Sequence, residues 1–203
     1  MSNLHNFMGL FGCMLILVAI PLTLIRQPEF SRKTITITIF TMMGLAAIPV
    51  YDLPIVAYMR AVIGDLSITS MLMLSIFIAS AYAGRQYLEP VDKRWLTSAV
   101  LVCALIVYPL GLGLTMMDTY ALGYGSLPPF LLLLGSGIFL LWQQRYLLLT
   151  MLLVAIGAYL LTLLATTNLW DYLFDPWIAV VALIQKVRNV LRNLKNQPTK
   201  QSG

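Results

Sequence analysis

The sequence predicts an all-α integral membrane protein, a polytopic bundle of about seven transmembrane helices with six as the alternative. Its 203 residues are 60% hydrophobic and only 10% charged, whereas a soluble domain is about half apolar and about a quarter charged. Apolar stretches that approach the length of a bilayer crossing, about 20 residues, recur along the chain. Eight segments lie between and beyond these stretches. Four of them hold all but one of the 13 Lys and Arg residues, and the four that alternate with them hold only Arg60.

Seven stretches are predicted as membrane spans, separated by short loops. The spans are expected at residues 7–25, 34–50, 66–84, 96–117, 128–142, 147–168 and 175–190. The last span is the least apolar, because Lys186 and Arg188 would have to extend along the helix to the membrane surface. A surface-lying amphipathic helix is the alternative for that segment. Asp175-Pro176 favours a helix start, since Asp accepts free amide hydrogens and Pro suits the first helical position.

The alternation of basic segments predicts the orientation, because Lys and Arg collect on the cytoplasmic side of multi-span proteins. With seven spans, every cation except Arg60 lies inside. With six, the five cations after residue 185 would face outward, leaving seven inside and six outside. We therefore expect seven spans in a bacterial inner membrane, with a periplasmic N-terminus and a cytoplasmic C-terminus. Residues 1–195 form one predicted transmembrane domain, and residues 196–203 a disordered polar tail.

The connection between the second and third spans has helical periodicity of its own. Its apolar residues repeat with the spacing of one helix face: Ile55, Val56, Met59, Val62 and Ile63. Asp52 and Pro54 would mark the start of this helix and Gly64 its end, and Asp65 would then cap the third span. We predict a short interfacial helix in the outer loop 52–63.

The carboxylates that this topology places outside form a candidate ligand or partner site together with Arg60. They are Asp52, Asp65, Asp118, Asp171 and Asp175. Paired carboxylates can act as general acid and base, and an arginine can hold the phosphate of a lipid or of a lipid-linked sugar. The competing interpretation is structural: helix caps for Asp52, Asp65 and Asp175, and an ion pair between Arg60 and Asp52 or Asp65.

The sequence gives no basis for a metal, a cofactor or a nucleic-acid partner. His5 is the single histidine, and Cys13 and Cys103 lie in separate apolar stretches near opposite predicted faces. The cations follow the predicted membrane edges instead of forming one basic patch with interleaved aromatics. Ionisable residues are missing from the middle of the predicted spans, which disfavours an ion-coupled carrier.

Three functions fit these patterns. The leading hypothesis is a non-enzymatic accessory or scaffold component that acts at the periplasmic face in envelope lipid or glycan handling. Its expected partners are the lipid bilayer and either a membrane protein or a lipid-linked substrate. The alternatives are a small lipid-active membrane enzyme with an Asp/Arg site at the outer interface, and a facilitator for an uncharged small molecule.

Overall fold

The computed structural model describes residues 2–24, 31–112 and 118–195, so the predicted disordered tail at 196–203 lies outside the described residues. The fold is all-helical, and 79% of the described residues lie in helices. Seven long helices make up most of the described chain. They are α1 (Ser2–Leu24), α2 (Arg32–Ala47), α4 (Ile68–Ala83), α5 (Pro90–Gly111), α6 (Leu127–Trp142), α7 (Tyr146–Leu160) and α9 (Pro176–Lys195).

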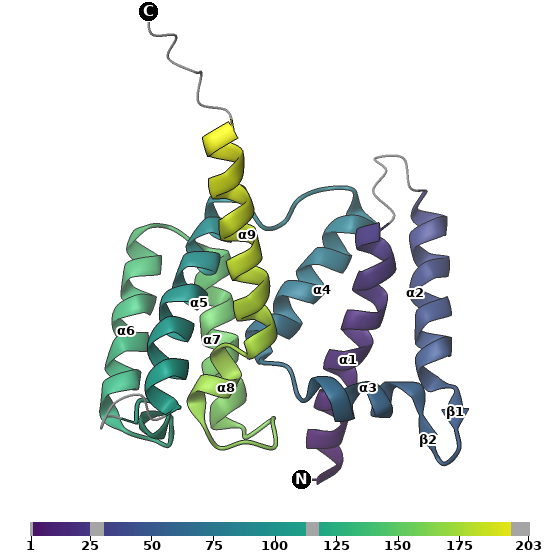
Figure 1. Ribbon diagram of the computed structural model, residues 1–203, viewed down its shortest axis with the longest axis horizontal. Coiled ribbons are helices and arrows are strands. Elements are labelled where there is room, and N and C mark those ends of the chain that lie inside the picture. The colour runs from purple at the N-terminus through teal and green to yellow at the C-terminus, as the bar shows by residue number, and fades with distance from the viewer. Residues whose placement is uncertain (1, 25–30, 113–117, 196–203) are drawn as a thin grey trace, which may run out of the picture.

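The long helices run alternately between two ends of the molecule (Figure 1). One end, below called the hairpin end, carries every short element. These are strands β1 (Pro49–Val50) and β2 (Leu53–Pro54), helix α3 (Ile55–Ile63), the 3-10 turn η1 (Ala121–Gly123) and helix α8 (Leu169–Leu173). The other end, below called the basic end, holds the α4–α5 and α6–α7 turns and the last turns of α9.

Each predicted span overlaps one long helix, but several boundaries differ from the prediction. The second helix ends at Ala47 because Pro49 begins a β-hairpin, whose strands pair Pro49 with Pro54. The fourth begins at Pro90, a proline in the first turn, where its missing N–H costs nothing. The sixth ends at Leu160, just before Thr162 adopts a φ of 49°. The predicted outer helix begins at Ile55 and not at Asp52.

Two of the described helices, Asn3–Leu24 and Pro90–Gly111, are long and apolar enough to cross a membrane on length and composition. Helices α4, α6 and α7 are equally apolar but shorter, with 16, 16 and 15 residues. Helix length and composition therefore support two of the seven predicted spans.

Helix packing joins the whole described chain into one bundle. Helix α1 contacts α2, α3 and α4; α4 also contacts α7 and α8; α5 packs along α9, and α6 along α7. One core cluster forms around Leu66, Met71, Ala155 and Tyr172, close to the hairpin end. A second, around Val100, Phe174 and Ile178, holds α5 against α8 and α9.

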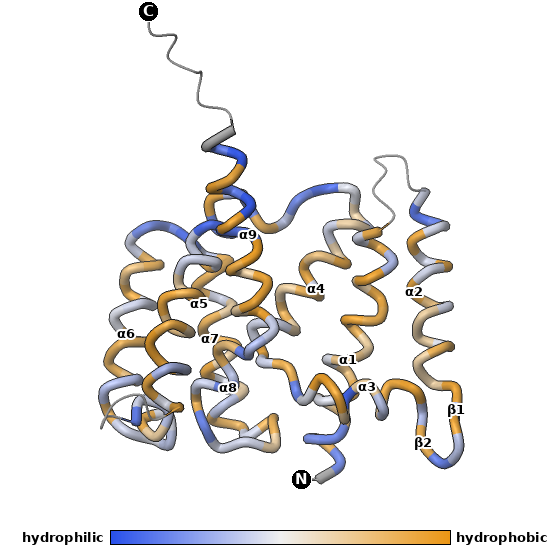
Figure 2. The backbone as a smooth tube through the Cα atoms, viewed as in Figure 1, coloured by the Kyte–Doolittle hydropathy of each residue, from blue (hydrophilic) through white to orange (hydrophobic). Residues whose placement is uncertain are grey.

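The outer surface of the long helices is apolar. Phe40, Leu105 and Trp142 are 68%, 70% and 78% exposed, although a water-soluble helix would turn such side chains inward. Helices α1, α4, α6 and α7 contain no Asp, Glu, Lys or Arg. Figure 2 shows the result: the middle of the bundle is largely hydrophobic, and hydrophilic residues gather at its two ends.

Tyr172 anchors the irregular chain between α7 and α8. Its side chain is fully buried, and its hydroxyl accepts from the backbone N–H of Leu164 at 3.1 Å and donates to the carbonyl of Thr166 at 3.0 Å. Burial raises the pKa of Tyr172, so the hydroxyl stays protonated and keeps its donor.

We expect Tyr172→Phe to destabilise the protein by about 1–3 kcal/mol, because it leaves these buried backbone groups without their partner. Thermal and denaturant unfolding in detergent would measure the loss. Tyr159→Phe is the matched control, since the Tyr159 ring packs edge-on against Tyr172 at 5.4 Å and the substitution keeps that ring. Equal losses in the two variants would show that the Tyr172 hydroxyl has no special role.

Candidate functional site

Arg60 and Asp65 form a two-pronged ion pair at the hairpin end. Arg60 Nε donates to Asp65 Oδ1 at 2.5 Å, and Arg60 Nη2 donates to Asp65 Oδ2 at 3.0 Å. Helix α3 presents the arginine, and Gly64, with a φ of 81°, ends that helix and turns the chain so that Asp65 faces back. The pairing of Arg60 with Asp65, one of its two predicted partners, is confirmed.

Helix α1 completes this ion pair from a distant part of the sequence. Arg60 Nη1 donates to Asn6 Oδ1 at 3.0 Å. Gly9, one turn further along, lies directly against the pair, and a Cβ at that position would overlap both the guanidinium and the carboxylate. The side chains of Arg60 and Asp65 are 22% and 27% exposed. The hydrogen bond to Asp65 raises the pKa of Arg60 further above its usual value, so the guanidinium remains charged.

A groove of about 570 Å³ opens beside this arginine, within the range of about 300–1,000 Å³ typical of ligand sites. Apolar and small residues form most of its wall, with the polar groups at one side. It is lined by Asn6, Leu10, Leu53, Pro54, Ala57, Arg60, Ala61, Gly64 and Asp65. A guanidinium has five N–H donors; Asp65 and Asn6 accept from three of them, and the other two have no protein acceptor among the described residues.

Asp171 lies in a separate network on the other side of the hairpin end. It accepts from Thr166 Oγ1 at 2.6 Å and from the Tyr120 hydroxyl at 2.9 Å. Asn168, just before α8, also bonds to the start of η1, because its side-chain N–H₂ donates to the carbonyl of Tyr120 at 2.9 Å. Burial, and after it the bond to Asp171, raises the pKa of Tyr120. Asp171 therefore holds η1 against α8 and has no second carboxylate bonded to it.

Asp175 is hydrogen-bonded to the starts of both α4 and α9 in the interior of the protein. It is 5% exposed; its Oδ1 accepts from the N–H of Ile178 at 2.9 Å, and its Oδ2 from the N–H of Ser67 at 2.8 Å. The predicted cap at the start of α9 is present. Ser67, and not Asp65, caps α4, because its hydroxyl accepts from the N–H of Ser70 at 3.1 Å. The predicted capping role of Asp65 is wrong, since its carboxylate is turned toward Arg60.

The two remaining aspartates lie on the surface. Asp118 Oδ1 accepts from the N–H of Ala121 at 3.0 Å and so starts η1. Asp52 sits in the exposed turn of the β-hairpin, beside Tyr51, whose φ is 54°. Within the described residues, Asp52 has no hydrogen bond or ion pair. Its predicted role as a helix start is wrong, because the hairpin separates it from α3.

The predicted outer aspartates thus share one end of the molecule but do not converge on one point. Of the six predicted site residues, only Arg60 and Asp65 contact each other. Sequence reasoning missed Asn6 and Gly9. A signal for them existed: Asn6, Gly9 and Cys13 repeat at helical spacing, as the polar and small residues of an otherwise apolar segment.

The basic end carries a second ion-pair cluster. Arg145 Nη1 donates to Asp92 at 3.3 Å and to Glu89 at 3.4 Å, which ties the α6–α7 turn to the start of α5. These two acids, Glu89 and Asp92, lie at the start of α5. They are thereby partnered within the bundle.

Comparisons of the chain with family descriptions, with curated proteins and with solved structures found no match.

Gly9→Ala tests whether close approach of α1 holds the ion pair. We expect it to destabilise the protein by about 1–3 kcal/mol, since Arg60 and Asp65 must move apart while partly buried. Gly44→Ala in α2 is the matched control, because a Cβ there meets nothing within 4 Å. That variant should gain up to about 1 kcal/mol of helix propensity. The free energy of unfolding of both variants would be measured in the same detergent. A Gly9→Ala variant more stable than the parent protein would contradict this geometry.

Proposed function

We propose that this chain is a seven-span protein of a bacterial inner membrane, with the hairpin end on the periplasmic side and the basic end in the cytoplasm. The support is the apolar outer surface of the long helices and the placement of charge at their two ends. Cations gather at the basic end, whereas Arg60, the single cation of the hairpin end among the described residues, is paired with Asp65.

The short helices fit this proposal if apolar chain beyond their ends also lies in the membrane. A 16-residue helix such as α4 is about 24 Å long, less than the hydrocarbon thickness of about 30 Å. Leu66 before α4 and Leu164 after α7 extend the apolar length and are 2% and 3% exposed. Non-helical backbone is tolerated at membrane depth where protein covers it.

The groove beside Arg60 supports the proposal that this chain is an accessory protein. It would bind the head group of an amphiphile, such as a phosphate-bearing lipid or a lipid-linked sugar, at the periplasmic face. One observation carries the proposal: a guanidinium anchored by Asp65 and Asn6 lines an otherwise largely apolar groove of about 570 Å³. Apolar walls suit a hydrocarbon chain, and the guanidinium suits an anionic head group.

The geometry favours binding over catalysis. Asp65 is engaged by Arg60, Asp171 by two hydroxyls and Asp175 by two backbone amides. A general acid and base pair needs two carboxyl groups positioned on either side of one reacting bond. These acids instead stabilise turns and helix starts that hold the groove in place.

Hexadecyl phosphate is a direct probe of the groove. The full chain in nanodiscs of zwitterionic lipid should bind it, and Arg60→Gln should weaken binding about tenfold or more, because a charged hydrogen bond contributes about 1.5–3 kcal/mol. Titration followed by tryptophan fluorescence would measure the affinities. Arg32→Gln, at the opposite end of the molecule, removes the same charge and is the matched control, so it should bind normally.

A second variant separates binding from folding. Ala57→Phe fills the groove at a residue that is not part of the Arg60–Asp65 ion pair, so it should abolish binding at the groove while thermal unfolding stays near that of the parent protein. The proposal fails if Ala57→Phe and Arg60→Gln both bind hexadecyl phosphate normally, or if hexadecanol binds as tightly as the phosphate.

A further inference from the structure

We propose that a crevice between α5 and α9 at the basic end binds the head group of an anionic phospholipid from the cytoplasmic leaflet. Three cations mark this site: Lys93 on α5, and Arg188 and Arg192 on α9. The site is below called the basic crevice. This site lies at the opposite end from the Arg60 groove. It rests on the membrane placement proposed above, but not on ligand binding by that groove.

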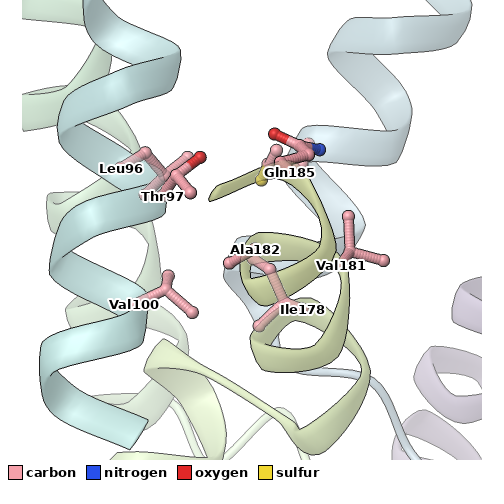
Figure 3. Close-up of a pocket in the computed structure, with 8 residues that line it drawn as sticks. Leu96, Thr97, Val100, Ile178, Val181, Ala182 and Gln185 are labelled. Carbon is pink, nitrogen blue, oxygen red and sulfur yellow. The ribbon is translucent and has the colours of Figure 1, made fainter. Parts of the chain in front are cut away.

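The side of α9 that faces the bundle changes character along its length. In its first half Ile178 and Ala182 are buried against α5. Gln185 continues that face and lines a small cavity of about 10 Å³ with Leu96, Thr97 and Val100 of α5 (Figure 3). Arg188 and Arg192 follow Gln185 at i+3 and i+7, so helical register places them on the same side of α9.

The opposite side of α9 remains apolar up to its last turns. Val187, Val190 and Leu191 are all about half-exposed, and their spacing puts them on one helix face. In water these side chains would be unfavourable, whereas lipid chains would cover them. In the proposed placement, lipid therefore reaches the level of residues 187–191 on the outer side of α9. Arg188 and Arg192 would then lie between that lipid and the bundle.

Helix α5 presents a cation to the same crevice. Leu96 and Val100 face α9, and Lys93 precedes Leu96 by three residues, which places it on that face. Asp92, its neighbour in sequence, points elsewhere: it is 6% exposed and bonds to Arg145. The nearest acids of α5 are thus engaged on the α7 side, away from α9.

The basic crevice has no protein anion to neutralise it. Among the described residues, no ion pair involves Lys93, Arg188 or Arg192. The sequence from Pro176 onward contains five Lys and Arg residues and no Asp or Glu. Clustered cations just inside the cytoplasmic surface attract anionic lipid, by about 1 kcal/mol for each cation. A phospholipid phosphate satisfies this charge, and its chains cover the apolar faces beneath.

The experiment uses the full chain in zwitterionic detergent, with phosphatidylglycerol and phosphatidylcholine of the same acyl chains offered together. Native mass spectrometry counts the lipids retained. The parent protein should retain phosphatidylglycerol about tenfold better, and the triple variant Lys93→Gln/Arg188→Gln/Arg192→Gln should lose that preference. The triple variant Arg32→Gln/Lys33→Gln/Arg85→Gln removes the same charge from the same end and should keep the preference.

Several results would overturn the proposal: no preference in the parent protein, or equal losses in the two triple variants. Complete competition by millimolar inorganic phosphate would also overturn it, because the site would then be a free-anion site. Arg60→Gln separates the two proposals. The Arg60→Gln variant should keep the preference for phosphatidylglycerol even if hexadecyl phosphate does not bind the groove. If this variant lost the preference, the retained lipid would be at the hairpin end instead, and the proposal would be overturned.

Discussion

Exclusion of charge from the middle of the bundle is the constraint on which the other features depend. Helices α1, α4, α6 and α7 carry no Asp, Glu, Lys or Arg, and α2 and α5 carry theirs only within their first five residues. An ion costs several kcal/mol in an apolar medium unless it is paired. Charged groups must therefore gather where the chain turns, and the two ends of the molecule acquire different chemistry. Five aspartates and one arginine lie at the hairpin end, and cations are in excess at the basic end.

The hairpin end has a rigid frame because its turns bond to one another across the sequence. Asp175 accepts from Ser67, and the Trp177 indole donates to the carbonyl of Ile63 at 2.9 Å, so the start of α9 is fastened to both ends of the α3–α4 junction. That junction carries Gly64 and Asp65, which set the position of Arg60. The groove is thus held by contacts whose residues lie over a hundred positions apart. Preorganisation of this kind would let a single arginine serve as the binding group of the proposed function.

The sequence predicted what depends on local pattern and missed what depends on tertiary packing. The seven long helices follow from runs of apolar residues, and the Asp175 cap and the Arg60–Asp65 pair follow from close spacing along the chain. The β-hairpin was missed because Asp52 and Pro54 fit a helix start equally well, and Tyr51 gives no sign of its positive φ. Asn6 and Gly9 were missed as site residues because their contact with Arg60 depends on the register of α1 against α3. Convergence of the aspartates likewise depends on tertiary packing. Asp65, Asp118, Asp171 and Asp175 each bond to a nearby amide, hydroxyl or cation, and Asp52 lies in the exposed hairpin turn.

Labelling of two introduced cysteines tests the membrane placement most directly. In a chain carrying Cys13→Ala and Cys103→Ala, Asp52→Cys lies in the exposed hairpin turn and Gln144→Cys in the exposed α6–α7 turn, at opposite ends of the molecule. A membrane-impermeant maleimide added to intact spheroplasts should label the cysteine at position 52 and reach the one at position 144 only after lysis. Labelling of both before lysis, or the reverse order, would contradict the placement.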